Sequence, residues 1–178
     1  SGAVSVNTVK GCFGILVDAL LARWVPSFRR RPKRRVSAAP KVYFSDVGVV
    51  SRLARRGVLH RGSEAYGRAF ENWIFHELSA YLSYSDADAR ISYWRLVTGA
   101  EVDFVVGDME LAVEAKGSER VRSHHLKGLR QLKIDHPEVQ RRIIVSLDPS
   151  LLTTDDGIEQ MPYDHFARAL WSGALLGR

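Results

Sequence analysis

The sequence has almost no cysteine. Cys12 is the only one in 178 residues, which excludes an internal disulfide framework and a zinc cluster built on cysteine. The chain also has no apolar run long enough to span a membrane and no signal-peptide pattern. We therefore expect a cytoplasmic protein that makes no membrane contact. Because Ser1 and Gly2 look like an arbitrary start, we also expect the chain to be a piece of a longer polypeptide.

Two motifs of enzyme chemistry are missing as well. The chain has no G-x-x-x-x-G-K-[ST] phosphate-binding loop, so it carries no ATPase of that class. It has no H-E-x-x-H motif, and the adjacent His124 and His125 face different ways on a helix. We therefore expect no zinc site.

The positive charge of the chain is concentrated near its start. Residues 1–62 hold 13 Lys and Arg against 2 Asp and Glu, a net charge of +11. Residues 63–178 hold 13 against 18, a net of −5, which leaves the overall +6. This asymmetry predicts two functional parts, the first of which is able to meet a polyanion.

Residues 1–62 are predicted to form the tail half of a winged-helix arrangement. The predicted elements are a helix over 7–22 with Asn7 or Ser5 as its N-cap, hairpin arms near 24–28 and 41–44, and a helix from Asp46 to Gly57. Pro26 is expected to stop the first helix. The tip of the hairpin is the basic stretch RRRPKRR, residues 29–35.

Residues 63–178 are predicted to form a second domain of the α/β class. Its predicted elements are a helix from Ser63, strands over 91–97, 101–106 and 111–116, a helix over 123–135, a strand over 141–147 and a last helix over 161–173. Periodicity and the positions of caps and prolines support these assignments. Up to residue 147 the order of elements is α-β-β-β-α-β.

The long helix that Ser63 opens has a polar stripe and an apolar face. The residues of the polar stripe are Arg68, Asn72, His76, Ser79 and Ser83. Glu71 lies outside this stripe, at the side where the helix would meet the sheet. Gly67, one turn earlier, is expected to let the backbone approach a neighbour.

Charged residues interrupt the two central strands. A four-residue loop over 107–110 sets Val106 opposite Leu111, and counting back then sets Asp103 opposite Glu114. Glu114 and Lys116 share one face of their strand, because side chains alternate. Two carboxylates so close repel each other. A shared proton, a cation such as Lys116, or a metal ion is needed to hold them.

A hard metal ion suits carboxylate oxygens that have no His or Cys beside them. Mg²⁺ or Mn²⁺ held by Asp103, Glu114 and Glu71 would polarise a phosphodiester and activate a water. Lys116 would orient that water or stabilise the developing negative charge. The alternatives are surface ion pairs, of Lys116 with Glu101 or Glu114 and of Glu71 with Arg68 or Arg95.

These residues, within the order α-β-β-β-α-β, resemble the PD-(D/E)XK nuclease superfamily. The stretches KVYFSDVGVVSRLARRG, GRAFENWIFHEL, GAEVDFVV and VEAK resemble more narrowly the C-terminal domain of unknown function 4143 of bacterial and archaeal AAA-type ATPases. In that family a winged-helix segment connects the ATPase to a nuclease-like domain. The resemblance covers about residues 5 to 172 and implies an upstream ATPase module as partner.

Residue by residue, the resemblance assigns Asp103, Glu114 and Lys116 to the superfamily motif and Glu71 to its helical Glu. No proline precedes Asp103, which is a departure from the pattern. Gln131 matches an auxiliary polar residue only weakly, and a polar surface position is the alternative.

The basic hairpin tip is predicted to contact the phosphates of DNA. Its cations are Arg29, Arg30, Arg31, Lys33, Arg34 and Arg35. A solvated turn or contact with an acidic protein surface, such as that of the parent ATPase, are the alternatives.

Two functions follow from these patterns. The first is a Mg²⁺-dependent phosphodiesterase acting on DNA, with its active site at the carboxylates. The second is a catalytically inactive module of the ATPase that binds nucleic acid or mediates assembly, including assembly into oligomers. A third, weaker hypothesis is a role in a toxin–antitoxin or defence system, which no residue decides.

Overall fold

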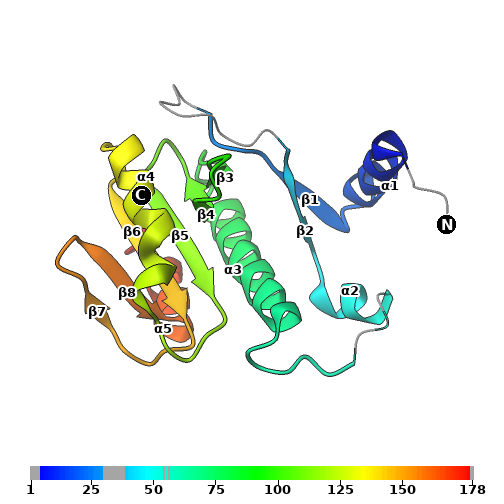
Figure 1. Cartoon of the computed structure of the whole chain (residues 1–178). Coiled ribbons are helices and arrows are strands. Elements are labelled where there is room, and N and C mark those ends of the chain that lie inside the picture. The colour runs from blue at the N-terminus through cyan, green and yellow to red at the C-terminus, as the bar shows by residue number, and fades with distance from the viewer. Residues whose placement is uncertain (1–4, 30–38, 54, 56, 177–178) are drawn as a thin grey trace.

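The computed structural model describes residues 5–29, 39–53, 55 and 57–176 and shows a mixed α/β protein (Figure 1). The hairpin-tip residues from Arg30 to Arg35 lie outside these ranges, so their predicted contact with DNA stays a prediction. Within the described ranges, no helix is both long enough and apolar enough to cross a membrane.

The chain begins with α1 (Val6–Asp18), whose N-terminus is capped by Ser5 as one of the two predicted caps. The helix ends before position 22, so the prediction that Pro26 stops it is wrong. Leu20 adopts a left-handed conformation with φ 60°, and the backbone N–H of Leu21 donates to the carbonyl of Leu16 at 2.8 Å. This is a Schellman motif, which glycine normally closes, so its sequence signal is absent.

The predicted hairpin arms pair as β1 (Ala22–Val25) and β2 (Lys41–Phe44), which run antiparallel with Ala22 opposite Phe44. The next helix, α2 (Val47–Leu53), follows Asp46 as predicted. The carboxylate of Asp46 accepts from the backbone N–H of Gly48 at 2.6 Å. It thereby satisfies one of the free donors at the start of the helix.

One six-stranded sheet forms the centre of the remaining chain. Its strands, in spatial order, are β3 (Ile91–Arg95), β4 (Glu101–Val106), β5 (Leu111–Lys116), β6 (Arg141–Ser146), β8 (Ile158–Pro162) and β7 (Leu152–Thr153). β4 runs antiparallel to both of its neighbours, β3 and β5. β5, β6 and β8 run parallel to one another. The predicted strands over 101–106 and 111–116 match β4 and β5.

The sequence analysis missed β7 and β8. The polar residues of β8 make it resemble a loop, yet each finds a partner in the fold. Glu159 pairs with Arg141 at 2.8 Å, and Gln160 donates to the carbonyl of Ser150 at 3.3 Å. β8 therefore forms where it pairs with β6 and β7, and its sequence shows no regular apolar alternation that would predict it.

The helices cover the sheet on both faces (Figure 1). α3 (Glu64–Tyr84) and α5 (Tyr163–Trp171) pack on one face, and α4 (Lys127–Asp135) packs on the other. Ser63 caps α3 as predicted, since its hydroxyl accepts from the N–H of Tyr66 at 3.1 Å. The helix predicted over 123–135 is divided into the short 3₁₀ helix η1 (Ser123–Leu126) and α4.

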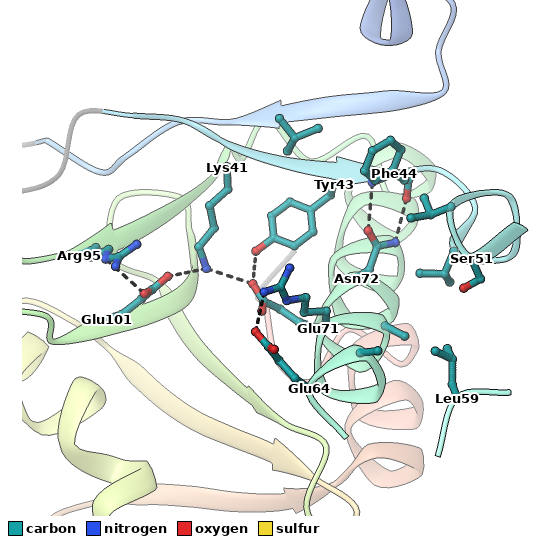
Figure 2. A pocket seen from close by; sticks show the side chains of 16 residues that line it. Lys41, Tyr43, Phe44, Ser51, Leu59, Glu64, Glu71, Asn72, Arg95 and Glu101 are labelled. Atoms are coloured by element: carbon teal, nitrogen blue, oxygen red, sulfur yellow. Dashed lines mark hydrogen bonds and ion pairs between the residues drawn. The ribbon is translucent and has the colours of Figure 1, made fainter. Parts of the chain in front are cut away.

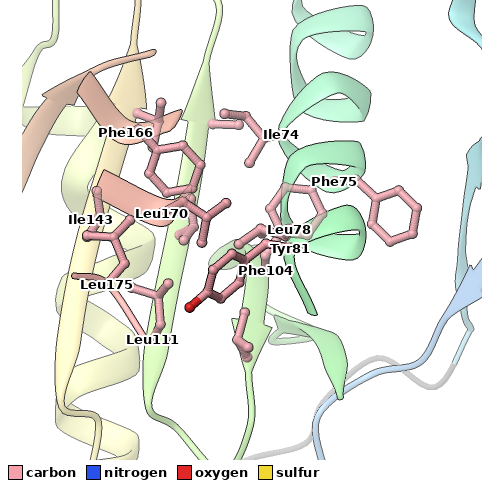
Figure 3. Close-up of a cluster of buried hydrophobic side chains, with 14 of the residues drawn as sticks. Ile74, Phe75, Leu78, Tyr81, Phe104, Leu111, Ile143, Phe166, Leu170 and Leu175 are labelled. Carbon is pink, nitrogen blue, oxygen red and sulfur yellow. The ribbon is translucent and has the colours of Figure 1, made fainter. Parts of the chain in front are cut away.

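The faces of the sheet bury two hydrophobic clusters. The cluster under α3 and α5 includes Ile74, Leu78, Phe104, Phe166 and Leu170 (Figure 3). The cluster under α4 includes Trp94, Leu129, Leu132 and Ile144. Burying each such side chain contributes about 1.5–3 kcal/mol. The first cluster also contains Val25 and Tyr43, so β1 and β2 pack onto the core of the rest of the chain.

One of two predictions about α3 is wrong. Asn72 was expected on the polar stripe but is 7% exposed. Its side-chain oxygen accepts from the N–H of Phe44 at 3.0 Å, and its amide donates to the carbonyl of Phe44 at 2.8 Å. The backbone at Gly67 does approach a neighbour, as predicted, although a Cβ at Gly67 itself would meet nothing within 4 Å. The close contact comes from Gly117, where an added Cβ would lie 3.4 Å from the Cα of Gly67.

A close approach does occur at Gly128 of α4. A Cβ at this position would lie 1.8 Å from the carbonyl oxygen of Glu101, so α4 packs directly on the backbone of β4. We expect Gly128→Ala to lower the free energy of unfolding by about 3 kcal/mol, because the helix must move away. Gly67→Ala is the matched control, since its Cβ meets nothing within 4 Å, and should stabilise by about 0.5–1 kcal/mol. Urea unfolding of both variants checks this, and equal stabilities would contradict the packing.

Candidate carboxylate site

Three carboxylates converge on the ammonium group of Lys41, the first residue of β2. Figure 2 shows two of them, those of Glu71 and Glu101. The Nζ atom lies 3.0 Å from Glu71 Oε1, 2.6 Å from Glu101 Oε1 and 3.1 Å from Asp103 Oδ1. These residues come from α3 and from β4. Lys41 therefore brings Glu71 and Asp103 close together, as predicted, but through a cation that the sequence analysis did not consider.

The geometry of β2 and the side-chain amide of Asn72 together hold Lys41 in position. Alternation along β2 places Lys41 and Tyr43 on the same face. The ring of Tyr43 stacks on Phe75 with centroids 4.5 Å apart, and its hydroxyl donates to Glu71 Oε1. The two hydrogen bonds between Asn72 and the backbone of Phe44 hold the end of β2 against α3. The strand cannot shift without losing both.

The charges in this group depend on one another. Burial would lower the pKa of Lys41, but the charges of Asp103 and Glu71 outweigh it and raise that pKa far above its ordinary value. Burial raises the pKa of Glu71, and the charge of Asp103 raises it further, whereas Lys41 opposes the shift. At neutral pH Lys41 is therefore a fixed cation, and the buried carboxylates depend on it.

A second pair of oppositely charged side chains, Glu114 and Lys116, lies at the end of β5. Lys116 Nζ lies 2.6 Å from Glu114 Oε1, which is one of the ion pairs considered as an alternative to a catalytic site. Burial raises the pKa of Glu114 to about 8, and the charge of Asp103 adds to this. Glu114 Oε2 is buried and has no hydrogen-bond partner among the described residues.

Asp103 lies at an irregularity between β3 and β4. Trp94 is opposite Val102, but Ser92 is opposite Val105, so Asp103 and Phe104 together face the single residue Tyr93. This is a β-bulge, which redirects side chains and occurs often beside functional sites. The sequence analysis assumed unbroken alternation and missed it.

The predicted register between β4 and β5 is confirmed. Val106 lies opposite Leu111, and Phe104 lies opposite Val113. Asp103 and Glu114 come next in this register, where the ladder ends. Asp103 Oδ2 there accepts from the backbone N–H of Ala115 at 3.0 Å.

Gln131 lies apart from the ion pairs of Lys41 and Lys116. Its side chain donates to Asp135 Oδ1 at 3.3 Å. It lines a cavity of about 580 Å³ along η1 and α4, together with Ser123 and His124. Its assignment as an auxiliary site residue stays a prediction.

Sequence reasoning missed four residues of the site, which are Lys41, Tyr43, Asn72 and Glu101. A signal did exist for the first two, because alternation puts both on one face of a strand in which Val42 and Phe44 take the other. No local signal pairs Glu101 with Lys41. The partners lie far apart in the chain and meet only in the fold.

The described residues do not fit a divalent metal ion in this arrangement. They contain no group of three or more His, Cys, Asp or Glu side chains placed to hold a metal. Lys41 contacts three of the carboxylates, the N–H of Ala115 occupies the second oxygen of Asp103, and Lys116 contacts Glu114. Among the described residues, Glu114 Oε2 is a buried carboxylate oxygen of this group that has no hydrogen-bond partner.

A cavity of about 710 Å³ lies beside the Lys41 group, between β2, α2 and α3 (Figure 2). Lys41, Glu71 and Glu101 line its charged end, and Val47 and Val50 of α2 line its apolar end. The cluster is therefore accessible from one side. The arrangement fixes β2 against α3 and β4 through the contacts of Lys41.

These features define an α/β protein with an internally neutralised carboxylate cluster. The chain belongs to the family described as Domain of unknown function (DUF4143), whose model matches residues 66–166. This confirms the family suggested by the sequence. Residues 1–59 match a second model, Domain of unknown function (DUF8612). Lys41 lies in the second match, and its carboxylate partners lie in the first.

The chain is also similar to the uncharacterized proteins Rv2008c of Mycobacterium tuberculosis and Mb2031c of Mycobacterium bovis. Each is 29% identical over 106 residues, which cover 58% of this chain and 23% of the relative. The aligned part therefore spans about a quarter of the length of these relatives. No solved structure matches the chain significantly.

Replacing Lys41 tests its role as the counter-ion. We expect Lys41→Met to lower the free energy of unfolding by about 3 kcal/mol at pH 7.5, because three carboxylates are left facing one another. The loss should shrink toward pH 5, as protonation of Glu71 relieves the repulsion. Lys41→Arg should retain most of the stability. Chemical denaturation at both pH values checks this, and a Lys41→Met protein as stable as the wild type would contradict it.

The raised pKa of Glu114 predicts a pH dependence of stability. Since this pKa is about 8 in the folded protein against an ordinary 4.5, the folded state binds more protons between these values. The stabilising contribution of the neutral form is therefore complete below pH 4.5 and is lost as the pH rises through 8. Glu114→Gln should be more stable than wild type at pH 8.5, by on the order of 2 kcal/mol.

The advantage of Glu114→Gln should disappear near pH 4.5. Thermal unfolding across this range measures it, with Glu64→Gln on the exposed start of α3 as control. A constant difference between Glu114→Gln and wild type at all pH values would show that burial does not shift Glu114.

Proposed function

We propose that this chain is a non-hydrolytic, nuclease-like module that binds DNA within a longer ATPase-type protein. The observation that carries this proposal is the position of Lys41. Its ammonium group fills the place among Glu71, Glu101 and Asp103 that a divalent cation would need. The carboxylates then serve as an anchor for β2 rather than as a metal centre.

Several features support relating the module to PD-(D/E)XK nucleases. The elements from α3 to β6 follow the order α-β-β-β-α-β, and Asp103, Glu114 and Lys116 lie at the adjoining ends of β4 and β5. Upstream, the succession of α1, the β1–β2 hairpin and α2 supports the partial winged helix. A winged-helix hairpin is a common element for contacting DNA, and residues 1–62 carry a net charge of +11.

The length of the relatives supports the proposal that this module works with a further one. The aligned part covers 23% of each mycobacterial relative, so those proteins have ample length for an ATPase module. The family resemblance is the ground for choosing an AAA-type ATPase as this partner.

A metal-dependent phosphodiesterase is the second candidate, and one observation favours it. Glu114 Oε2 is buried without a partner beside Asp103, and an unsatisfied buried carboxylate oxygen is costly. Mg²⁺ or Mn²⁺ would supply an activated water and neutralise phosphate charge there. For a metal ion to bind there, Lys41 would first have to move away from Asp103. The two candidates therefore predict different results when a metal is added.

A DNA-binding measurement with and without metal decides between them. We expect fluorescence anisotropy to show that the chain binds a DNA duplex with the same affinity in Mg²⁺ and in EDTA. We expect gels to show no cleavage of the duplex with Mg²⁺ or Mn²⁺. Replacing the six cations of 29–35 by Gln should reduce the slope of log K against log salt by up to about 5, at about 0.9 per phosphate contact.

Cleavage that requires metal and disappears in both Asp103→Asn and Lys116→Ala would overturn the non-hydrolytic assignment in favour of the enzyme. A wild-type chain that binds no DNA at low salt would overturn DNA binding itself. A fold check by circular dichroism accompanies each variant.

A further inference from the structure

A second basic stretch follows directly after the charge pair of β5. Residues 116–127 hold the cations Lys116, Arg120, Arg122 and Lys127 and a single acid, Glu119. Glu119 is already paired with Arg61 at 3.0 Å. This local positive charge stands out because residues 63–178 as a whole carry a net charge of −5.

Three of these cations have no counter-ion in the part of the chain that the structure describes. Arg120, Arg122 and Lys127 are exposed and make no ion pair there. Four other arginines of the same domain are paired, namely Arg68 with Glu64, Arg130 with Asp156, Arg141 with Glu159 and Arg168 with Asp164. A group of unpaired cations repels itself, and an external polyanion relieves this.

The backbone that carries these cations is held in place. The carbonyl of Ser118 accepts from the N–H of Leu147 at 3.1 Å. The buried carboxylate of Asp148 accepts from the N–H of Val121 at 2.9 Å and from that of Ser150 at 3.0 Å. The hydrogen bond from Val121 holds the pKa of Asp148 below its ordinary value. The cations are therefore presented by an ordered loop, so little backbone entropy is lost when they bind.

Neutral hydrogen-bond donors lie among the cations. The Nδ1 atom of His125 accepts from the backbone N–H of Arg122 at 3.1 Å, which places the proton of the neutral ring on Nε2. Burial lowers the pKa of His125, and the charges of His124 and Lys116 lower it further, so the ring is neutral at pH 7.

A concave surface continues from the loop. The cavity of about 580 Å³ along η1 and α4 is lined by Ser123, His124, Lys127, Arg130, Gln131 and Ile134. Most of these side chains are cationic or can donate a hydrogen bond, and none is acidic. Phosphate oxygens accept such bonds, and Arg and Lys are their usual partners.

We propose that Arg120, Arg122 and Lys127, with Ser123 and His125 between them, form a binding surface for the sugar-phosphate backbone of DNA. This surface (the 120–127 surface) is separate from the basic hairpin tip. It rests on the proposed DNA-binding function and names a place for the nucleic acid. It runs along the chain from the loop after β5 to the first residue of α4. It reads no base sequence, because its contacts are with phosphates.

The double variant Arg120→Ala/Arg122→Ala tests this surface on the full chain. Binding of a DNA duplex is measured by fluorescence anisotropy between about 50 and 300 mM KCl. Salt in this range weakens contacts between cations and phosphates strongly enough to give a slope. We expect the slope of log K against log salt to fall by about 2 and the affinity to fall about tenfold at the lower salt. The variant Arg68→Ala/Arg168→Ala removes the same charge from two exposed, paired arginines and should change affinity less than twofold.

The possible results are distinct. A charge-conserving Arg120→Lys/Arg122→Lys variant should keep most of the affinity, which excludes a fold defect as the cause of the loss. Wild-type binding that Arg120→Ala/Arg122→Ala leaves unchanged would overturn the 120–127 surface and leave the DNA-binding function standing. An equal loss in both double variants would also overturn it, because only net charge would then matter. Absence of wild-type binding would overturn both.

Discussion

The ion pairs of Lys41 are the interaction on which the arrangement of this chain depends. A single ammonium group from β2 neutralises carboxylates from α3 and β4 that are 30 and 62 residues away in the sequence. Neither partner tolerates burial alone, because an unpaired ion is costly in an apolar setting. The N-terminal segment and the sheet domain are therefore bound to each other by charge as well as by the apolar contacts of Val25 and Tyr43.

The ion pairs of Lys41 change which role is expected for the carboxylates. In sequence, Glu71, Asp103 and Glu114 have the composition of a site for a hard metal ion. In the fold, Lys41 contacts one oxygen of Glu71 and one of Asp103, and a backbone N–H contacts the other oxygen of Asp103. These contacts support the proposed structural anchor. The groups left to meet a polyanion are then cations without an ion pair, such as those that follow Lys116 in the sequence.

Much of the sheet was predictable because its signals are local. The bounds of β4 and β5 and their register follow from alternation and loop length, and the capping of α3 by Ser63 follows from one hydroxyl. The Asp103 bulge, the burial of Asn72 and the strand β8 were not predictable. Each depends on a partner from elsewhere in the chain, such as the backbone of Phe44 for Asn72, and a polar residue shows no sign of such a partner in its own neighbourhood.

The sequence by itself determined the α/β class, the order of elements from α3 to β6 and the common face of Glu114 and Lys116, since periodicity and short loops decide these. The family was suggested by the resemblance of several stretches to it. Only the tertiary structure decided which cation meets which carboxylate. Lys41 is six residues from Arg35 of the hairpin tip and 30 or more from its carboxylate partners, and nothing local distinguishes its role from that of the arginines. The distinction arises because β2 packs against α3, where burial makes a strong pairing necessary.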